Sequence, residues 1–535
     1  MSTMPWLFDA NGEIGYGSTR FPDFPTCRDR LAHMDRLGIA RSLVWSCQGR
    51  DQNPPTGNRR LLAELDTLTP FERRRLVPSL VISPSMLYEK GGVDDLVSMM
   101  QNGVHALWTF PTKLRHRLQH LEPILERVQS LRPTLMVDVS KTTDDRDLLA
   151  LAERFPNMRI VCMFGMWPHL FCMSLIHVLR HTDNVLIDSS WLHSGGTLEM
   201  IVRKFGSDRI VFATGWKSHN GASIAHLLAA EVDEDVREDI AHRNLERLLQ
   251  LEPTESVVPA IEIDSDRGDV WASWLAGRPL GVELMDAHAH LGPLSAWFKE
   301  DGRPESEVAA LLQHMDRLGI RTAFVSSSEA LFSNPVEGNR SLEETLSPHG
   351  DRFRGYYSYN PVYAELLDGQ LEECFARPFW AGLKLLCDYW QVPVTHPDLE
   401  PAYAFANAHR LPILLHTWEG ACDSPAMLTD IARRYPEARF LLGHSGGTDQ
   451  GRREAIKLAK DHPNVYLEWC GGFCSSILWE DAIAQVGSDR VVFGTDALGH
   501  SIDWELGRLL SLDLPTKAIL PILGDNMRGI IMSRT

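Results

Sequence analysis

Five side chains with the chemistry of metal ligands follow short apolar segments in the second half of this 535-residue chain: His288, His290, His416, His444 and Asp496. His288 and His290 are one residue apart, and alternate residues of a strand point the same way, so both imidazoles can reach one ion. Imidazole and carboxylate ligands suit a first-row divalent metal, zinc being the leading candidate. Such an ion lowers the pKa of bound water from ~16 toward ~7 and makes hydroxide available at neutral pH.

The elements that must position these residues are alternating strands and helices. Short β-branched or aromatic runs alternate with longer helical stretches, which is typical of a parallel sheet wrapped by helices. Eight strands are expected at about 283–287, 321–327, 353–358, 380–386, 412–416, 438–443, 464–468 and 490–494. This count is typical of a (β/α)8 barrel, whose active site lies at the C-terminal ends of the strands. The five residues, together with Lys384 in the fourth strand, fall at that end.

The chain also repeats itself over a period that is far too long for a solenoid. His33 to Ile39 recurs letter for letter as His314 to Ile320, 281 positions later. The first half has eight expected strands of its own, near 5–9, 41–46, 76–82, 104–109, 133–138, 158–163, 184–188 and 209–214. We therefore predict an α/β fold of two tandem (β/α)8 TIM barrels, at 1–251 and 282–535, with a linker at 252–281.

The first copy lacks most of the ligand set. Its alignment to the second copy pairs Asn11 with His288, Glu13 with His290, His105 with Lys384, Val137 with His416, Phe164 with His444 and Gly215 with Asp496. Only Glu13 and His105 in the first copy readily coordinate a metal, and two ligands do not close a site. We expect this degenerate barrel to hold no catalytic metal and to pair with the second barrel as a covalent imitation of a homodimer. The alternative is that histidines of this copy, such as His193 and His219, mark a repurposed pocket instead.

The ordered motifs of the second copy resemble the amidohydrolase superfamily, and within it the amidohydrolase-related (amidohydrolase 2) branch that includes non-oxidative decarboxylases. The motifs are DAHAHLG at 286–292, GLKL at 382–385, LLHT at 414–417, GHSGG at 443–447, FGTD at 493–496 and LGDNM at 523–527. The resemblance implies that the metal ligands are His288, His290, His416 and Asp496. It also implies that His444 acts on the substrate or on a second ion.

Lys384 has two interpretations under this resemblance. Its carbamylated amine would bridge two metals, as in binuclear members of the superfamily, or it is a buried amine that pairs with an acid or donates to substrate. The second interpretation gives one metal, most readily zinc. Substrate contacts are expected from Trp418, Glu419, Tyr389, Trp390, Glu468 and His500, which lie beside the strand ends. Cys470 and Cys474 form the one close couple of cysteines, and we expect small core residues there.

Two reactions fit these residues. In hydrolysis, our first expectation, Asp496 takes a proton from the activated water and His444 helps to stabilise the oxyanion. An amide, a lactone or another cyclic carboxylic derivative would be the substrate. The alternative is non-oxidative decarboxylation of an aromatic or unsaturated acid, in which the metal holds the carboxylate and a neighbouring group protonates carbon. A non-catalytic scaffold or binding protein is a third reading, which the ligand set disfavours.

Composition narrows the range of partners. The net charge of −18 and the absence of a large basic cluster argue against nucleic acid and acidic membranes. No run approaches the ~18 apolar residues of a membrane span, and the first residues lack the pattern of a signal peptide. Nine dispersed cysteines are typical of reduced thiols. We expect a cytoplasmic protein acting on a small molecule, as a single chain of paired barrels or as a further homo-oligomer.

Overall fold

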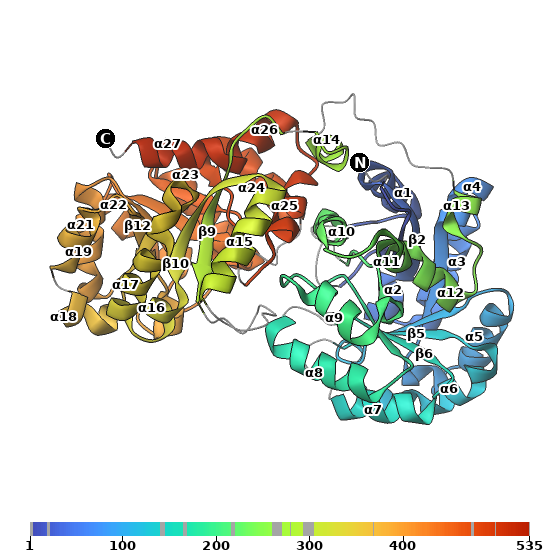
Figure 1. The fold of residues 1–535 in the computed structure, drawn as a ribbon. Helices are drawn as coiled ribbons and strands as arrows, with labels where there is room; N and C mark the ends of the chain where they lie inside the picture. Colours follow the sequence, from blue (N-terminus) through green and yellow to red (C-terminus); the bar gives the residue numbers. More distant parts are fainter. Residues whose placement is uncertain are drawn as a thin grey trace. The chain divides into compact units, whose positions relative to one another are not determined.

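Each half of the chain forms a parallel sheet whose eight strands follow the order of the sequence, with helices in the connections (Figure 1). The structure is a computed structural model and describes residues 4–18, 22–139, 145–163, 168–215, 220–258, 270–278, 280–292, 304–367, 369–471, 476–497 and 499–533. It divides into two compact units, Met1–Asp264 and Ser265–Thr535. Each sheet closes on itself, because Ala10 N donates to Phe212 O at 2.9 Å and Ala287 N donates to Phe493 O at 2.9 Å. The prediction of two (β/α)8 barrels is confirmed.

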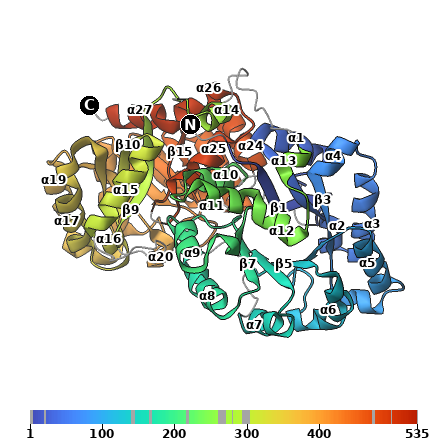
Figure 2. The same cartoon turned by 45° about the vertical axis from the view of Figure 1, so that its right-hand side comes forward.

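Unit 1 carries the strands β1 Leu7–Ile14, β2 Ile39–Ser46, β3 Leu76–Val81, β4 Ala106–Thr109, β5 Thr134–Asp138, β6 Arg159–Met163, β7 Val185–Asp188 and β8 Ile210–Val211. Its α-helices are α1 Cys27–Leu37, α2 Cys47–Asp51, α3 Pro54–Leu65, α4 Pro70–Arg75, α5 Gly92–Gln101, α6 Glu122–Val128, α7 Asp145–Arg154, α8 Pro168–His181, α9 Thr197–Phe205, α10 Asn220–Ala229, α11 Glu234–Glu238, α12 Asn244–Leu249 and α13 Thr254–Val257. Figure 2 shows α3, α5, α6, α7 and α8 around the outside of this barrel.

Unit 2 carries the strands β9 Leu284–Leu291, β10 Ile320–Ser327, β11 Phe353–Ser358, β12 Trp380–Leu385, β13 Pro412–His416, β14 Arg439–Gly443, β15 Val465–Glu468 and β16 Val491–Val492. Its α-helices are α14 Val270–Leu275, α15 Pro304–Leu318, α16 Ser328–Phe332, α17 Pro335–Leu346, α18 Ala364–Leu367, α19 Gln370–Phe375, α20 Cys387–Trp390, α21 Glu400–Ala408, α22 Thr429–Arg434, α23 Asp449–Asp461, α24 Ser476–Val486, α25 Ile502–Leu510, α26 Thr516–Leu520 and α27 Asn526–Met532. The domain limits drawn from the sequence remain a prediction.

The first and last strands of each barrel differ from the sequence expectation. β1 and β9 run eight residues, longer than expected, and each contains a register shift against its neighbour, between Asp9 and Gly12 and between Asp286 and Ala289. Such bulges re-aim side chains at barrel rims. β8 and β16 have only two residues, because Phe212 N and Phe493 N bond to carbonyls of π-helical turns, Ile240 O at 2.9 Å and Ile522 O at 3.0 Å.

Apolar side chains from successive strands fill the interior of both barrels. In unit 2 the cluster contains Ala287, Phe324, Tyr356, Ala381, Leu414, Leu441 and Val492, closed by Met527 and Ile530 of α27. The matching cluster of unit 1 is larger and more aromatic, with Trp45, Trp108 and Phe110 all buried. Within the part of the chain that the structure describes, no helix combines the length and apolar character that a membrane crossing needs.

Candidate metal centre

Three of the expected ligands meet at the C-terminal end of the second barrel. His288 and His290 come from β9, whose bulge lets both imidazoles face inward, and Asp496 follows β16. His290 Nε2 lies 3.0 Å from Asp496 Oδ1, and His288 Nε2 lies 3.6 Å from the same oxygen and 3.2 Å from His290 Nε2. Ligands of one tetrahedral or octahedral ion are separated by such distances when metal–ligand bonds are about 2.0–2.2 Å. The donor set therefore fits a divalent cation.

The far nitrogen of each imidazole is held by a neighbouring side chain. His288 Nδ1 lies 3.2 Å from Glu468 Oε2, and His416 Nδ1 lies 2.7 Å from Asp423 Oδ2. A carboxylate only accepts hydrogen bonds, so these Nδ1 atoms carry the proton and each Nε2 keeps its lone pair. Anchors of this kind fix the orientation and raise the basicity of metal-binding histidines.

His416 and His444 complete a group of four imidazoles. Their rings pack against neighbouring imidazoles of the group. The centroid of His444 lies 4.9 Å from that of His416 and 5.2 Å from that of His288. The ligand atoms of His416 do not join those of His288, His290 and Asp496 in a compact set among the described residues. His416 therefore stays a predicted ligand that would close on an ion from the β13 side.

The backbone around the centre is held in a strained form. His444, Ser445 and Asp496 have φ values of 61°, 45° and 56°, in the left-handed region that costs a residue with a side chain about 1–2 kcal/mol. Such strain persists only where surrounding bonds enforce it. Here Asp496 N donates to His288 O at 2.7 Å and Ser445 Oγ donates to Glu468 O at 2.7 Å, which fixes both turns against neighbouring strands.

Burial and charge prepare the group for a cation. Burial lowers the pKa of His288, His290 and His444, so the imidazoles are neutral and able to coordinate. Burial alone would raise the pKa of Asp496, but the hydrogen bond from His290 helps to hold that pKa well below its usual range. The carboxylate is therefore ionised at neutral pH.

Lys384 lies inside the centre. Its Nζ is 2.8 Å from His288 Nε2, the side chain is fully buried, and burial lowers the pKa of the amine to about 8. An ion bound at His288 Nε2 would take the lone pair that accepts this hydrogen bond. The amine would then turn toward substrate or be carbamylated, so both sequence interpretations of Lys384 stay predictions.

The six residues expected to contact substrate fall into two groups. Trp418 stacks on His416 with centroids 6.0 Å apart, Tyr389 meets the same ring edge-on at 5.3 Å, and His500 Nδ1 lies 2.9 Å from Glu505 Oε1. The other three point elsewhere. Glu419 is exposed and accepts from Thr448, Trp390 Nε1 donates to Leu331 O, and Glu468 is fully buried behind His288.

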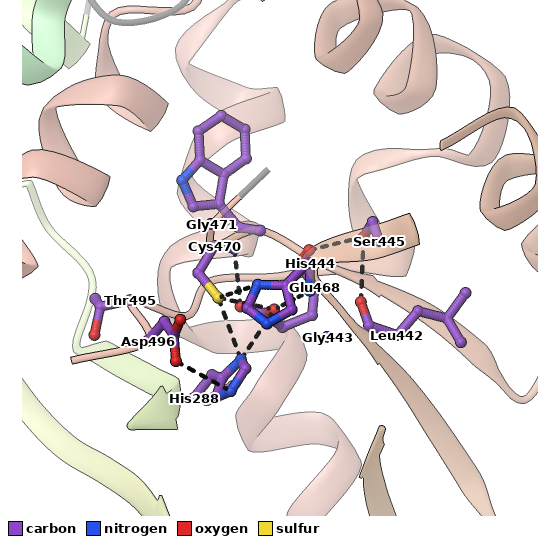
Figure 3. Close-up of polar contacts among 12 residues, drawn as sticks. His288, Leu442, Gly443, His444, Ser445, Glu468, Cys470, Gly471, Thr495 and Asp496 are labelled. Atoms are coloured by element: carbon purple, nitrogen blue, oxygen red, sulfur yellow. Dashed lines mark hydrogen bonds and ion pairs between the residues drawn. The ribbon is translucent and has the colours of Figure 1, made fainter. Parts of the chain in front are cut away.

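Sequence reasoning did not find several residues of the centre. Cys470 was expected to be a core residue, and it is fully buried, but its Sγ lies 3.2 Å from His288 Nδ1 and 3.6 Å from His444 Nδ1 (Figure 3). Ser326 Oγ lies 2.8 Å from His290 Nδ1. The signal for Cys470 was its place two residues beyond Glu468 at a strand end. Cys474 lies outside the described residues.

Strand register corrects two pairings between the copies. β4 aligns with β12 so that Trp108, and not His105, stands at the position of Lys384. β5 and β13 have the same length, and Asp138, and not Val137, ends β5 where His416 ends β13. Both pairings were wrong because apolar strands of similar composition do not fix their register by sequence. The counterpart of His444, Phe164, lies outside the described residues, as does His219.

The remaining counterparts in unit 1 are engaged by neighbours. Trp45 Nε1 donates to Asn11 Oδ1 at 2.9 Å, and Glu13 lies 3.6 Å from a guanidinium nitrogen of Arg50. Trp108 and Phe110 stack with centroids 5.3 Å apart, and both are buried. His193 is buried as well. The absence of a catalytic metal in unit 1 stays a prediction, which this aromatic filling supports.

The sequence is similar to a known protein family and to a characterised enzyme. Residues 91–251 and 285–528 match the profile of a family described as amidohydrolase. A gamma-resorcylate decarboxylase of Polaromonas sp. is 23% identical over 254 residues, covering 36% of this chain and 78% of the relative.

Solved structures give weaker likenesses. A 5-carboxyvanillate decarboxylase from Sphingomonas paucimobilis aligns with 12% identity and a TM-score of 0.37, covering 47% of this chain and 99% of its own. A dihydroxybenzoic acid decarboxylase from Polaromonas sp., solved with manganese and 2-nitroresorcinol, aligns with 16% identity and a TM-score of 0.38. The alignment covers 47% of this chain and 97% of the decarboxylase.

Proposed function

The chain belongs to the amidohydrolase family, and from that premise we propose that its second unit is a metal-dependent non-oxidative decarboxylase of a hydroxylated aromatic acid. The observation that carries the proposal is the convergence of His288, His290 and Asp496 at the mouth of the barrel. The likeness to gamma-resorcylate decarboxylase favours this reaction over the hydrolysis that the sequence first suggested. A divalent ion bound there would hold the substrate carboxylate and draw negative charge toward itself.

The side chains around the centre suit an aromatic anion. The Lys384 amine, with a pKa of about 8, is mostly protonated at pH 7 and adds a second positive charge where a carboxylate would sit. Trp418 and Tyr389 present aromatic surface beside His416, and an aromatic substrate can pack edge-to-face or offset against such rings. Together these side chains would bind the acid with its carboxylate inward.

Decarboxylation needs a proton for the ring carbon. That carbon gains the proton, its bond to the carboxylate breaks, and carbon dioxide leaves while the bonding electrons return to the ring. We assign the proton to His500. Burial opposes its charge, but the hydrogen bond to Glu505 raises the pKa of His500 above its usual value. Asp496 is ionised and serves less well as an acid.

Hydrolysis remains the second candidate, since the ionised Asp496 is suited to deprotonate water. Isotopes separate the two reactions in the metal-loaded full chain. Turnover of a hydroxybenzoate panel in D2O is expected to place one deuterium on the ring carbon and to release carbon dioxide, whereas lactones and amides are left intact. Solvent oxygen-18 appearing in the organic product would establish hydrolysis instead. Asp496→Asn serves as the inactive control.

A further inference from the structure

We propose that the second unit holds a second divalent cation at a thiolate site formed by His444, Cys470 and Asp496. The proposal rests on the metal-dependent function above and adds an ion of different chemistry to it. The ligand atoms of these three residues all lie within 4.8 Å of one another. We name this group the thiolate site, and the group of His288, His290 and Asp496 the histidine site.

The separation of the sulfur and the imidazole in the thiolate site matches that of two ligands of a tetrahedral ion. Cys470 Sγ lies 3.6 Å from His444 Nδ1. With a zinc–sulfur bond of about 2.3 Å and a zinc–nitrogen bond of about 2.05 Å, two ligands at the tetrahedral angle are separated by roughly 3.5 Å. Figure 3 shows the Cys470 sulfur joined by dashed lines to the imidazoles of both His444 and His288.

His288 Nδ1 also lies beside the thiol and could compete with His444 as a metal ligand, but the hydrogen bond that His288 Nδ1 donates excludes this. His288 Nδ1 carries the proton that Glu468 Oε2 accepts, so this nitrogen has no lone pair for a metal. Glu468 in turn accepts from Cys470 N and from His444 N, both at 2.9 Å. The carboxylate thus positions the two ligands of the thiolate site while it orients His288 for the histidine site.

The backbone beside Cys470 makes room for the same arrangement. Gly471 has φ of +59°, and a Cβ at this position would lie 2.5 Å from His444 Nδ1. A residue with a side chain here would clash with the imidazole of His444. Unit 1 lacks both Cys470 and Asp496. Two residues beyond the end of β7 stands Ser190, where Cys470 stands two residues beyond the end of β15. Gly215 stands at the position of Asp496.

Asp496 belongs to both sites, so its carboxylate would bridge the two ions. The ligand types of the sites differ. A thiolate selects softer ions such as zinc, whereas imidazole and carboxylate also accept manganese. The thiolate site should therefore retain zinc or cobalt under conditions in which the histidine site exchanges its ion.

Cobalt substitution of the full chain tests the proposal. The wild type is expected to bind two cobalt ions and to show thiolate-to-cobalt charge-transfer absorption in the near ultraviolet. Cys470→Ser should lose that absorption and one ion per chain. The matched control is Cys387→Ser, which removes another buried thiol of the same barrel and should keep both ions and the absorption.

The outcomes distinguish this proposal from the proposed function. One cobalt ion without charge-transfer absorption, in a chain that still decarboxylates, overturns the thiolate site and leaves the function standing. A chain that binds no metal overturns both. Charge-transfer absorption that persists in Cys470→Ser also overturns the site, because the sulfur ligand would then be another cysteine.

Discussion

At the residue scale, the centre depends on buried side chains that hold the candidate ligands in place. Asp423 shows this most clearly, because it is fully buried and its two oxygens serve different groups. One accepts from His416 Nδ1 at 2.7 Å and from Asp388 N at 3.3 Å, and the other accepts from Trp418 N at 3.3 Å. Asp423 thereby sets both the tautomer of a predicted ligand and the position of the tryptophan that stacks on it.

Asp423→Asn is expected to weaken metal binding by 10- to 100-fold, since the amide cannot accept strongly enough to fix the imidazole as a ligand. Competition with a chelator measures the change. Asp430→Asn, at an exposed position on α22 whose carboxylate pairs with Arg433, should bind metal as the wild type does. Equal affinity in both variants would show that His416 is not a ligand.

At the element scale, the turn after β14 is the most constrained part of the barrel mouth. Residues 444–447 all have positive φ. The Thr417 hydroxyl holds both ends of this turn, donating to Gly443 O at 2.7 Å and accepting from Gly446 N at 2.9 Å. The residue that follows β13 thus supports the turn that carries His444.

Thr417→Val keeps the shape of the side chain and removes both hydrogen bonds. We expect about 1–3 kcal/mol less unfolding free energy and a loss of kcat of about 10- to 100-fold, as His444 shifts from its place. Thr417→Ser retains the hydroxyl and should stay near the wild type in urea unfolding and in kinetics. Valine and serine variants with the same kcat would contradict the role given to the turn.

At the scale of the whole molecule, the two barrels have the same order of strands but differ in the buried acid that ends the seventh strand. Asp188, the counterpart of Glu468, is buried in unit 1, and burial with the charges of Asp9 and Asp138 raises its pKa to about 7. An acid whose folded pKa exceeds its unfolded value of about 3.9 favours folding most at low pH, and this contribution is lost as pH rises from about 4 to 7.

Asp188→Asn should therefore stabilise the chain increasingly with pH. The gain in unfolding free energy over the wild type is expected to be about 1.5 kcal/mol at pH 5 and to approach about 4 kcal/mol above pH 7. Urea midpoints at the two pH values measure it. Asp183→Asn, at an exposed position just before β7, should show no such trend. A pH-independent gain would mean that Asp188 is already ionised at pH 5.

The sequence was sufficient for the barrel count and for placing the candidate ligands on one strand or at strand ends, because periodicity and the strand-end rule are local. It was insufficient where two strands had to be placed side by side. The pairing of His105 failed by three residues and that of Val137 by one, since apolar strands can slide without changing their pattern. The contact of Cys470 with His444 was not predicted for the same reason, because it depends on the register of β14 beside β15.

The π-helical turns at Asp239–Arg243 and Pro521–Asp525 have a consequence for the history of the chain. Each supplies the carbonyl that receives the amide after the last strand, at Phe212 and at Phe493. A π-turn is a rare irregularity, so its presence at equivalent places indicates that a single ancestral barrel already had it before the gene doubled. Because both halves have kept the irregularity and only the second carries the predicted ligand set, we expect it to serve closure of the barrel rather than catalysis. The two halves can thus be compared with each other, and we expect the features that both retain to belong to the scaffold.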